Sequence, residues 1–138
     1  GLEVLLHDAN PRVLKQSLTT IAARLRQQTA KGQLESTACE TAIAALRGSD
    51  QLAALADAEM IIEVVPERLD LKVDVFTRLG QLAAPETILA SNTSGLDIDA
   101  LAKAAGRPDK VIGMHFFNPP PVMPLIEIEV DVISVIEA

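Results

Sequence analysis

The stretch AEMIIEVVPERLDLKVDVFTRLGQLAAPETILASN, residues 58–92, decides the fold class. Residues 58–65 form an apolar run that is typical of a strand buried on both faces. Residues 66–82 have a helical pattern that begins at a proline, and the apolar run at 86–92 predicts another strand. Strand, helix and strand in this order are typical of an α/β protein with a parallel sheet.

The rest of the chain continues this alternation of strands and helices. We predict further strands at 2–7, 109–116 and 121–130, and helices at 11–30, 36–46 and 97–105. Ser36 or Thr37 is expected to cap the second helix, and Gly48 to end it. The sequence thus predicts a Rossmann-like, doubly wound, mostly parallel α/β sheet, covered on both faces, with an inserted helical hairpin.

The composition describes one globular domain: 138 residues, 49% hydrophobic and 22% charged. A net charge of −7, with three Phe and no Trp or Tyr, argues against nucleic-acid binding. The single cysteine, Cys39, allows neither an internal disulfide nor a cysteine-cluster metal site, and we expect it to pack between helices. Without a membrane-length apolar run or a signal peptide, we expect a cytoplasmic protein that does not bind membranes.

The chain opens inside a strand pattern, GLEVLLHD, without an initiator Met, so we expect a fragment of a longer protein. The glycine loop G-x-G-x-x-G, which binds the pyrophosphate of dinucleotides, does not occur in these residues. We expect that loop in the strand and turn before Gly1.

Polar residues that could bind a ligand follow four of the predicted strands: Asp8, Glu67, residues 91–94 and residues 115–118. Ligands of doubly wound sheets bind at the carboxyl ends of the strands, so these residues predict a binding site. Two of these positions have a structural alternative. Asp8 suits a ribose diol and also the capping of the helix that begins at Pro11, and SNTSGL, 91–96, is also typical of a capping turn.

His115 ends a predicted strand, and Glu127 lies twelve residues later on the next apolar run. A carboxylate that orients one ring nitrogen of a histidine and stabilises its cation makes a competent general acid/base. A histidine at the end of a buried strand is also compatible with a purely structural role. The residues alone leave both interpretations open.

Two segments carry a resemblance to a known family: ILASNTSGL, and RPDKVIGMHFFNPPPVMPLIEI. Over residues 1–128 the sequence resembles the NAD-binding domain of L-3-hydroxyacyl-CoA dehydrogenases, including the 3-hydroxybutyryl-CoA enzymes. The resemblance implies an NAD-dependent oxidoreductase of fatty-acid β-oxidation or related pathways, which interconverts L-3-hydroxyacyl-CoA and 3-oxoacyl-CoA. The last residues, VDVISVIEA, do not follow the family pattern, and 129–138 are either a tail or the start of a C-terminal helical domain.

The resemblance also implies roles for individual residues. His115 matches the catalytic acid/base, Glu127 its partner carboxylate, and Ser94 the serine that contacts the substrate oxygen beside the nicotinamide. Asp8 matches the acidic residue on the adenine-side ribose, which favours NAD over NADP. The remaining matches are cofactor contacts at Glu67, Lys72 and Asn118, and a coenzyme A contact at Lys31.

The resemblance is incomplete, and other functions compete with it. Arg24 occupies the position of a serine that contacts coenzyme A in the family, and Pro124 replaces a common lysine. The C-terminal helical domain, through which the family forms homodimers, is not expected within this chain. The alternatives are an NAD-dependent dehydrogenase of the L-gulonate and lambda-crystallin branch, which NPP and PLIE resemble, a segment of a multifunctional β-oxidation protein, and a non-catalytic domain with the same fold.

Overall fold

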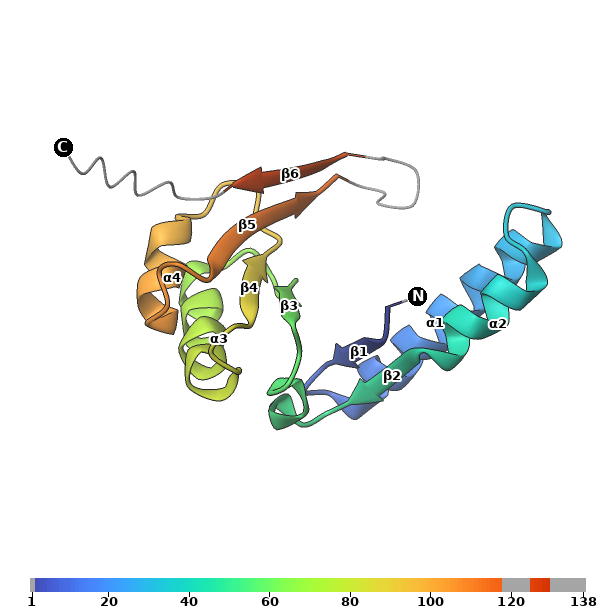
Figure 1. Cartoon of the computed structure of the whole chain (residues 1–138), viewed down its shortest axis with the longest axis horizontal. Coiled ribbons are helices and arrows are strands. Elements are labelled where there is room, and N and C mark those ends of the chain that lie inside the picture. The colour runs from blue at the N-terminus through green and yellow to red at the C-terminus, as the bar shows by residue number, and fades with distance from the viewer. Residues whose placement is uncertain (1, 118–124, 130–138) are drawn as a thin grey trace. The chain divides into compact units, whose positions relative to one another are not determined.

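The computed structural model describes residues 2–117 and 125–129 of the chain. The chain divides into two compact units, Gly1–Leu55 and Ala56–Ala138, coloured blue to green and green to red in Figure 1. Each unit has its own sheet. Asn118 and Pro124 lie outside the described residues.

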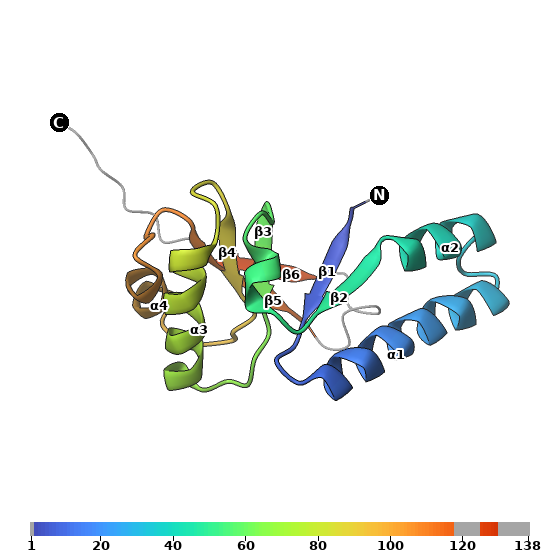
Figure 2. The ribbon, with the colours of Figure 1, turned by 90° about the horizontal axis from the view of Figure 1, so that it is seen from below.

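The first unit contains a two-stranded parallel sheet and a helical hairpin. Strand β1 (Val4–His7) pairs with β2 (Leu46–Ser49) in the register Val4↔Leu46. In the sequence between β1 and β2 stand two helices, α1 (Pro11–Ala30) and α2 (Ser36–Ala44), which lie side by side, as Figures 1 and 2 show. The 3-10 helix η1 (Leu52–Leu55) follows β2. The predicted hairpin is therefore confirmed.

Three predictions for the first unit are wrong in detail. Asn10, and not Asp8, caps α1, because its side-chain oxygen accepts the Arg12 N–H, while Asp8 accepts the Asn10 N–H. Helix α2 starts after Glu35, with no side-chain cap from Ser36 or Thr37. Gly48 does not end α2 but lies in β2, where an added Cβ would stand 2.7 Å from a Leu18 methyl of the overlying α1.

The described residues of the second unit form a four-stranded sheet with two helices. Its strands are β3 (Met60–Glu63), β4 (Ile88–Ser91), β5 (Val111–Phe116) and β6 (Ile126–Glu129), in the order β3-β4-β5-β6. The first three are parallel and β6 is antiparallel to β5. Crossover helix α3 (Leu69–Leu82) joins β3 to β4, and α4 (Ile98–Ala105) joins β4 to β5. The predicted Rossmann-like, mostly parallel α/β fold is confirmed.

The core of the second unit lies between the sheet and its helices. Ile61, Leu89 and Val111 share one face by strand register and are buried, together with Phe76 and Leu79 of α3 and with Leu101 of α4. On the opposite face, Met60 and Ile62 remain 40% and 41% exposed. The coverage of both faces that the apolar strands predicted is therefore incomplete among the described residues.

Helices α3 and α4 pack closely against each other at their C-terminal ends. An added Cβ on Gly80 would lie 2.0 Å from the Ala105 carbonyl oxygen, so only glycine permits this approach. Helix α4 begins at its N-cap Asp97 and ends at Gly106, whose φ of 67° is left-handed. The next residue, Arg107, donates from its guanidinium to the carbonyls of Gly80, Ala83 and Ala84 at the end of α3.

Candidate active site

His115 and Glu127 face each other across the antiparallel pair β5–β6. The strand register makes them direct partners, and 3.5 Å separates His115 Nδ1 from Glu127 Oε2. The Phe117 ring lies 4.7 Å from the imidazole, between ring centroids. The histidine side chain is 27% exposed and that of the glutamate 69%, so the pair is reached by solvent. The arrangement leaves Nε2 as the second imidazole nitrogen for a proton transfer.

Asn92 connects the end of β4 to the strand that carries His115. Its side-chain oxygen accepts the Phe116 N–H at 2.9 Å, and its own N–H donates to the Glu63 carbonyl at 2.8 Å. Asn92 therefore ties together the carboxyl ends of three strands, β3, β4 and β5. The sequence indicated Asn92 only as part of the polar segment 91–94.

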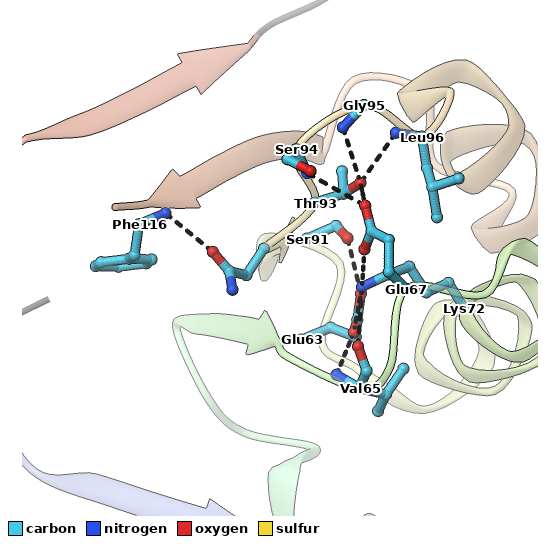
Figure 3. Close-up of polar contacts among 11 residues, drawn as sticks. Glu63, Val65, Glu67, Lys72, Ser91, Thr93, Ser94, Gly95, Leu96 and Phe116 are labelled. Carbon is cyan, nitrogen blue, oxygen red and sulfur yellow. Dashed lines mark hydrogen bonds and ion pairs between the residues drawn. The ribbon is translucent and has the colours of Figure 1, made fainter. Parts of the chain in front are cut away.

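Glu67 and Thr93 hold the loop that follows β4. The Thr93 hydroxyl donates to Glu67 Oε1, and the Ser94 N–H donates to the same oxygen at 3.2 Å. Thr93 Oγ1 in turn accepts the N–H groups of Gly95 and Leu96, at 3.3 and 3.0 Å (Figure 3). Hydrogen bonds to Thr93 therefore stabilise the loop internally. Hydrogen bonds to Glu67 attach it to the segment that precedes α3.

The pKa of the Glu67 carboxyl is lowered below its ordinary value. The hydrogen bond from Thr93 is the main cause, and the Ser94 N–H and the positive charge of Lys72 add to it, against the opposing effect of burial. Each of these donors favours the ionised carboxylate. Glu67 is therefore an anion at neutral pH.

Lys72 lies inside the second unit and not on its surface. Its ammonium group, with a fully buried side chain, donates to Glu63 Oε1 at 2.8 Å, Glu63 Oε2 at 3.0 Å and the Val65 carbonyl at 3.2 Å. Glu67 Oε2 is 3.5 Å away. Lys72 thus pairs with one buried and one partly exposed carboxylate.

Glu63 is the acceptor at the centre of this cluster. Its side chain is 1% exposed, and besides Lys72 it accepts the Val65 N–H at 2.5 Å and the Ser91 hydroxyl at 2.7 Å. Sequence reasoning missed Glu63. The signal that could have found it is an acidic residue in the apolar run MIIEVV, at the inward position of the strand, with a lysine nine residues later on the buried side of a helix.

The other predicted residues lie in the first unit or outside the described part. Asp8 follows β1 and accepts the Asn10 N–H at 2.8 Å. Lys31 is the exposed C-cap of α1, and Cys39 is buried in α2, as expected of a packing residue. Within residues 2–117 and 125–129, no helix is long and apolar enough to cross a membrane, and no three His, Cys, Asp or Glu side chains form a metal site.

Comparison with known proteins identifies relatives over nearly the whole chain. Residues 1–132 match the family described as 3-hydroxyacyl-CoA dehydrogenase, NAD binding domain. The chain is 41% identical over 128 residues to a probable 3-hydroxybutyryl-CoA dehydrogenase of Deinococcus radiodurans, covering 93% of this chain and 46% of the relative. It is 38% identical to the 3-hydroxyadipyl-CoA dehydrogenase of Escherichia coli K12, covering 93% of this chain and 27% of the relative.

A solved structure shows the same similarity. The crystal structure of a 3-hydroxybutyryl-CoA dehydrogenase from Escherichia coli K12 matches with a TM-score of 0.89 at 38% identity. The match covers 93% of this chain and 27% of that one. The chain thus spans less than half the length of these relatives.

Proposed function

The chain belongs to the 3-hydroxyacyl-CoA dehydrogenase family, through its NAD-binding domain, and from this we propose that it serves the interconversion of L-3-hydroxyacyl-CoA and 3-oxoacyl-CoA. The observation that carries the proposal is the pairing of His115 with Glu127 across β5 and β6, at the carboxyl end of the parallel strands. The cofactor supplies the hydride chemistry, and the protein orients the reactants and moves the proton.

In the proposed reaction His115 is the general acid/base. Its imidazole takes the proton of the 3-hydroxyl as the alcohol is oxidised and returns it in the reverse reaction. Glu127, 3.5 Å from Nδ1, orients the ring and stabilises the imidazolium that forms. Ser94 contacts the substrate oxygen through its hydroxyl, while its backbone N–H is bound to Glu67.

The remaining predicted residues are proposed as contacts to the two halves of NAD and to coenzyme A. The Glu67 carboxylate is ionised and 45% exposed, which suits a ribose hydroxyl, and Asn118 is proposed as a further contact on the same side. Asp8 is proposed to bind the adenine-side ribose, where a 2′-phosphate would meet a like charge. Lys31, which is exposed, is proposed to contact coenzyme A.

No G-x-G-x-x-G turn for the pyrophosphate occurs in the 138 residues. We therefore expect weak NAD binding by this chain alone. Four statements stay predictions from the sequence. Two concern organisation, namely a partial NAD-binding domain at 1–128 and a distinct segment at 129–138. The others are a cytoplasmic location and a homodimer formed through a C-terminal domain.

The proposal is tested with the full-length protein, by the oxidation of NADH with acetoacetyl-CoA, followed by the loss of NADH absorbance, and L-gulonate with NAD is the competing substrate pair. We expect turnover with acetoacetyl-CoA and, in His115→Gln, an unchanged affinity for NADH with turnover about 10²–10⁴-fold lower. Activity confined to L-gulonate would support the L-gulonate branch instead. Full activity of His115→Gln would remove histidine from the mechanism.

A further inference from the structure

The loop that carries Ser94 makes a set of contacts that the proposed chemistry does not use. Thr93 Oγ1 accepts two N–H groups of its own loop, from Gly95 and Leu96, and donates its proton to Glu67. Glu67 also accepts the Ser94 N–H. One hydroxyl and one carboxylate therefore account for three consecutive backbone N–H groups, at residues 94–96.

We propose that Thr93 and Glu67 form a latch that positions Ser94, with the buried Glu63–Lys72 pair as its anchor. Thr93 is then a positioning residue and not a catalytic one, since its hydroxyl is committed to Glu67 and to the loop. The role of Ser94 in this inference rests on the proposed function. The latch itself is a property of the fold and is testable without substrate.

The anchor follows from the contacts of Lys72. Its ammonium group is held by both oxygens of Glu63 and by the Val65 carbonyl, all within the second unit. From there it reaches Glu67 Oε2 at 3.5 Å, which leaves Oε1 for Thr93 and Ser94. Lys72 therefore acts on the loop from inside, by fixing the orientation of the Glu67 carboxylate.

The identity of residue 93 is constrained by this geometry. Serine retains the hydroxyl and can make the same three hydrogen bonds, whereas valine has the shape of threonine and can make none of them. Thr93→Val therefore removes the latch with little change in volume, and Thr93→Ser restores it. Thr77→Val is a matched control, because the Thr77 hydroxyl only donates to the Val73 carbonyl one turn earlier in α3.

The test is amide hydrogen exchange of the full 138-residue chain, read by NMR at residues 94–96 and in β4. We expect Thr93→Val to accelerate exchange of Gly95 and Leu96 at least about tenfold, with β4 unchanged. Thr93→Ser and Thr77→Val should leave these amides within about twofold of the wild type. Unchanged exchange in Thr93→Val, equal acceleration in β4, or failure of serine to restore protection would each overturn the latch.

A second measurement links the latch to turnover. If Thr93 positions Ser94 for the substrate oxygen, Thr93→Val lowers kcat about tenfold or more with a smaller change in the KM for NADH, and Thr93→Ser recovers kcat. Equal kcat values in the valine variant and the wild type would overturn the positioning role. These activities are measured in the full-length protein. Absence of any dehydrogenase activity in its wild-type form would refute the proposed function, while the exchange data would still decide the latch.

Discussion

Removing the ammonium group of Lys72 should destabilise the second unit more than any surface charge would. Lys72→Met keeps the length of the side chain but leaves Glu63, 1% exposed, without its cation. Two hydrogen bonds to Glu63 and one to Val65 are lost, while the Ser91 hydroxyl and the Val65 N–H still bond to the carboxylate. Breaking a buried ion pair from one side costs about 3–5 kcal/mol of unfolding free energy.

The double variant Glu63→Gln/Lys72→Met separates the ion pair from the packing. A neutral amide can still accept the Val65 N–H and donate to Ser91, so no buried charge remains unpaired. We expect the double variant to recover at least about half of the loss, because the penalty of a lone buried carboxylate is removed. If Lys72→Met were destabilising only because side-chain contacts are lost, the second substitution would not restore stability.

The assay is urea unfolding followed by circular dichroism, since the chain contains no Trp or Tyr for intrinsic fluorescence. Arg78→Met is the control, because Arg78 makes an exposed ion pair with Asp74 in the same helix, and its loss should cost below about 1 kcal/mol. A loss in Lys72→Met as small as that of the control, or a double variant no more stable than the single one, would refute the reasoning.

Three further predictions concern other parts of the second unit. Gly80→Ala should cost about 1–3 kcal/mol in urea unfolding, because its Cβ would meet the Ala105 carbonyl at 2.0 Å, whereas Gly95→Ala, with nothing within 4 Å, should cost far less. Asn92→Leu should speed amide exchange of Phe116 about fivefold, since that N–H loses its acceptor, and Asn92→Asp should not; equal rates in the two variants would contradict the bridge. Because the pKa of Glu67 is lowered in the folded state, its contribution to stability is present above its ordinary pKa of 4.5 and is lost as pH falls through the lower folded value. The stability difference between wild type and Glu67→Gln should therefore shrink in acid, and a constant difference from neutral pH to pH values below about 4 would contradict this assignment.

Local sequence patterns predicted most of the fold. Apolar runs identified β3, β4 and β5, and Gly106 marked the end of α4, because burial and left-handed backbone each leave a direct mark on residue type. Strand β2 was missed because LRGS has neither the β-branched residues nor the alternation of a strand. It forms a strand because it pairs with β1 in a parallel register, with Gly48 beneath Leu14 and Leu18 of α1.

The candidate site was only partly predictable. The spacing of His115 and Glu127 indicated neighbouring strands, and the structure brings the two side chains together. The hydrogen bonds of Glu63, Ser91 and Thr93 depend on how β3, β4 and α3 pack, and no local pattern encodes them. Lys72 is a second example of an arrangement that no local pattern encodes. The family resemblance matched this position to a cofactor contact, whereas in the structure its ammonium group is buried against Glu63.

The loop between β4 and α4 is supported where it leaves β4, and the helix that follows it is supported at its C-terminal end. On one side Asn92 is bonded to Glu63 and Phe116, and on the other Gly80 and Arg107 hold α4 against α3. Between these supports, Thr93 and Glu67 bind the N–H groups of residues 94–96, so the loop is restrained along its length. A ligand that binds at this loop therefore meets a backbone that is already ordered, and its binding should cost little conformational entropy there.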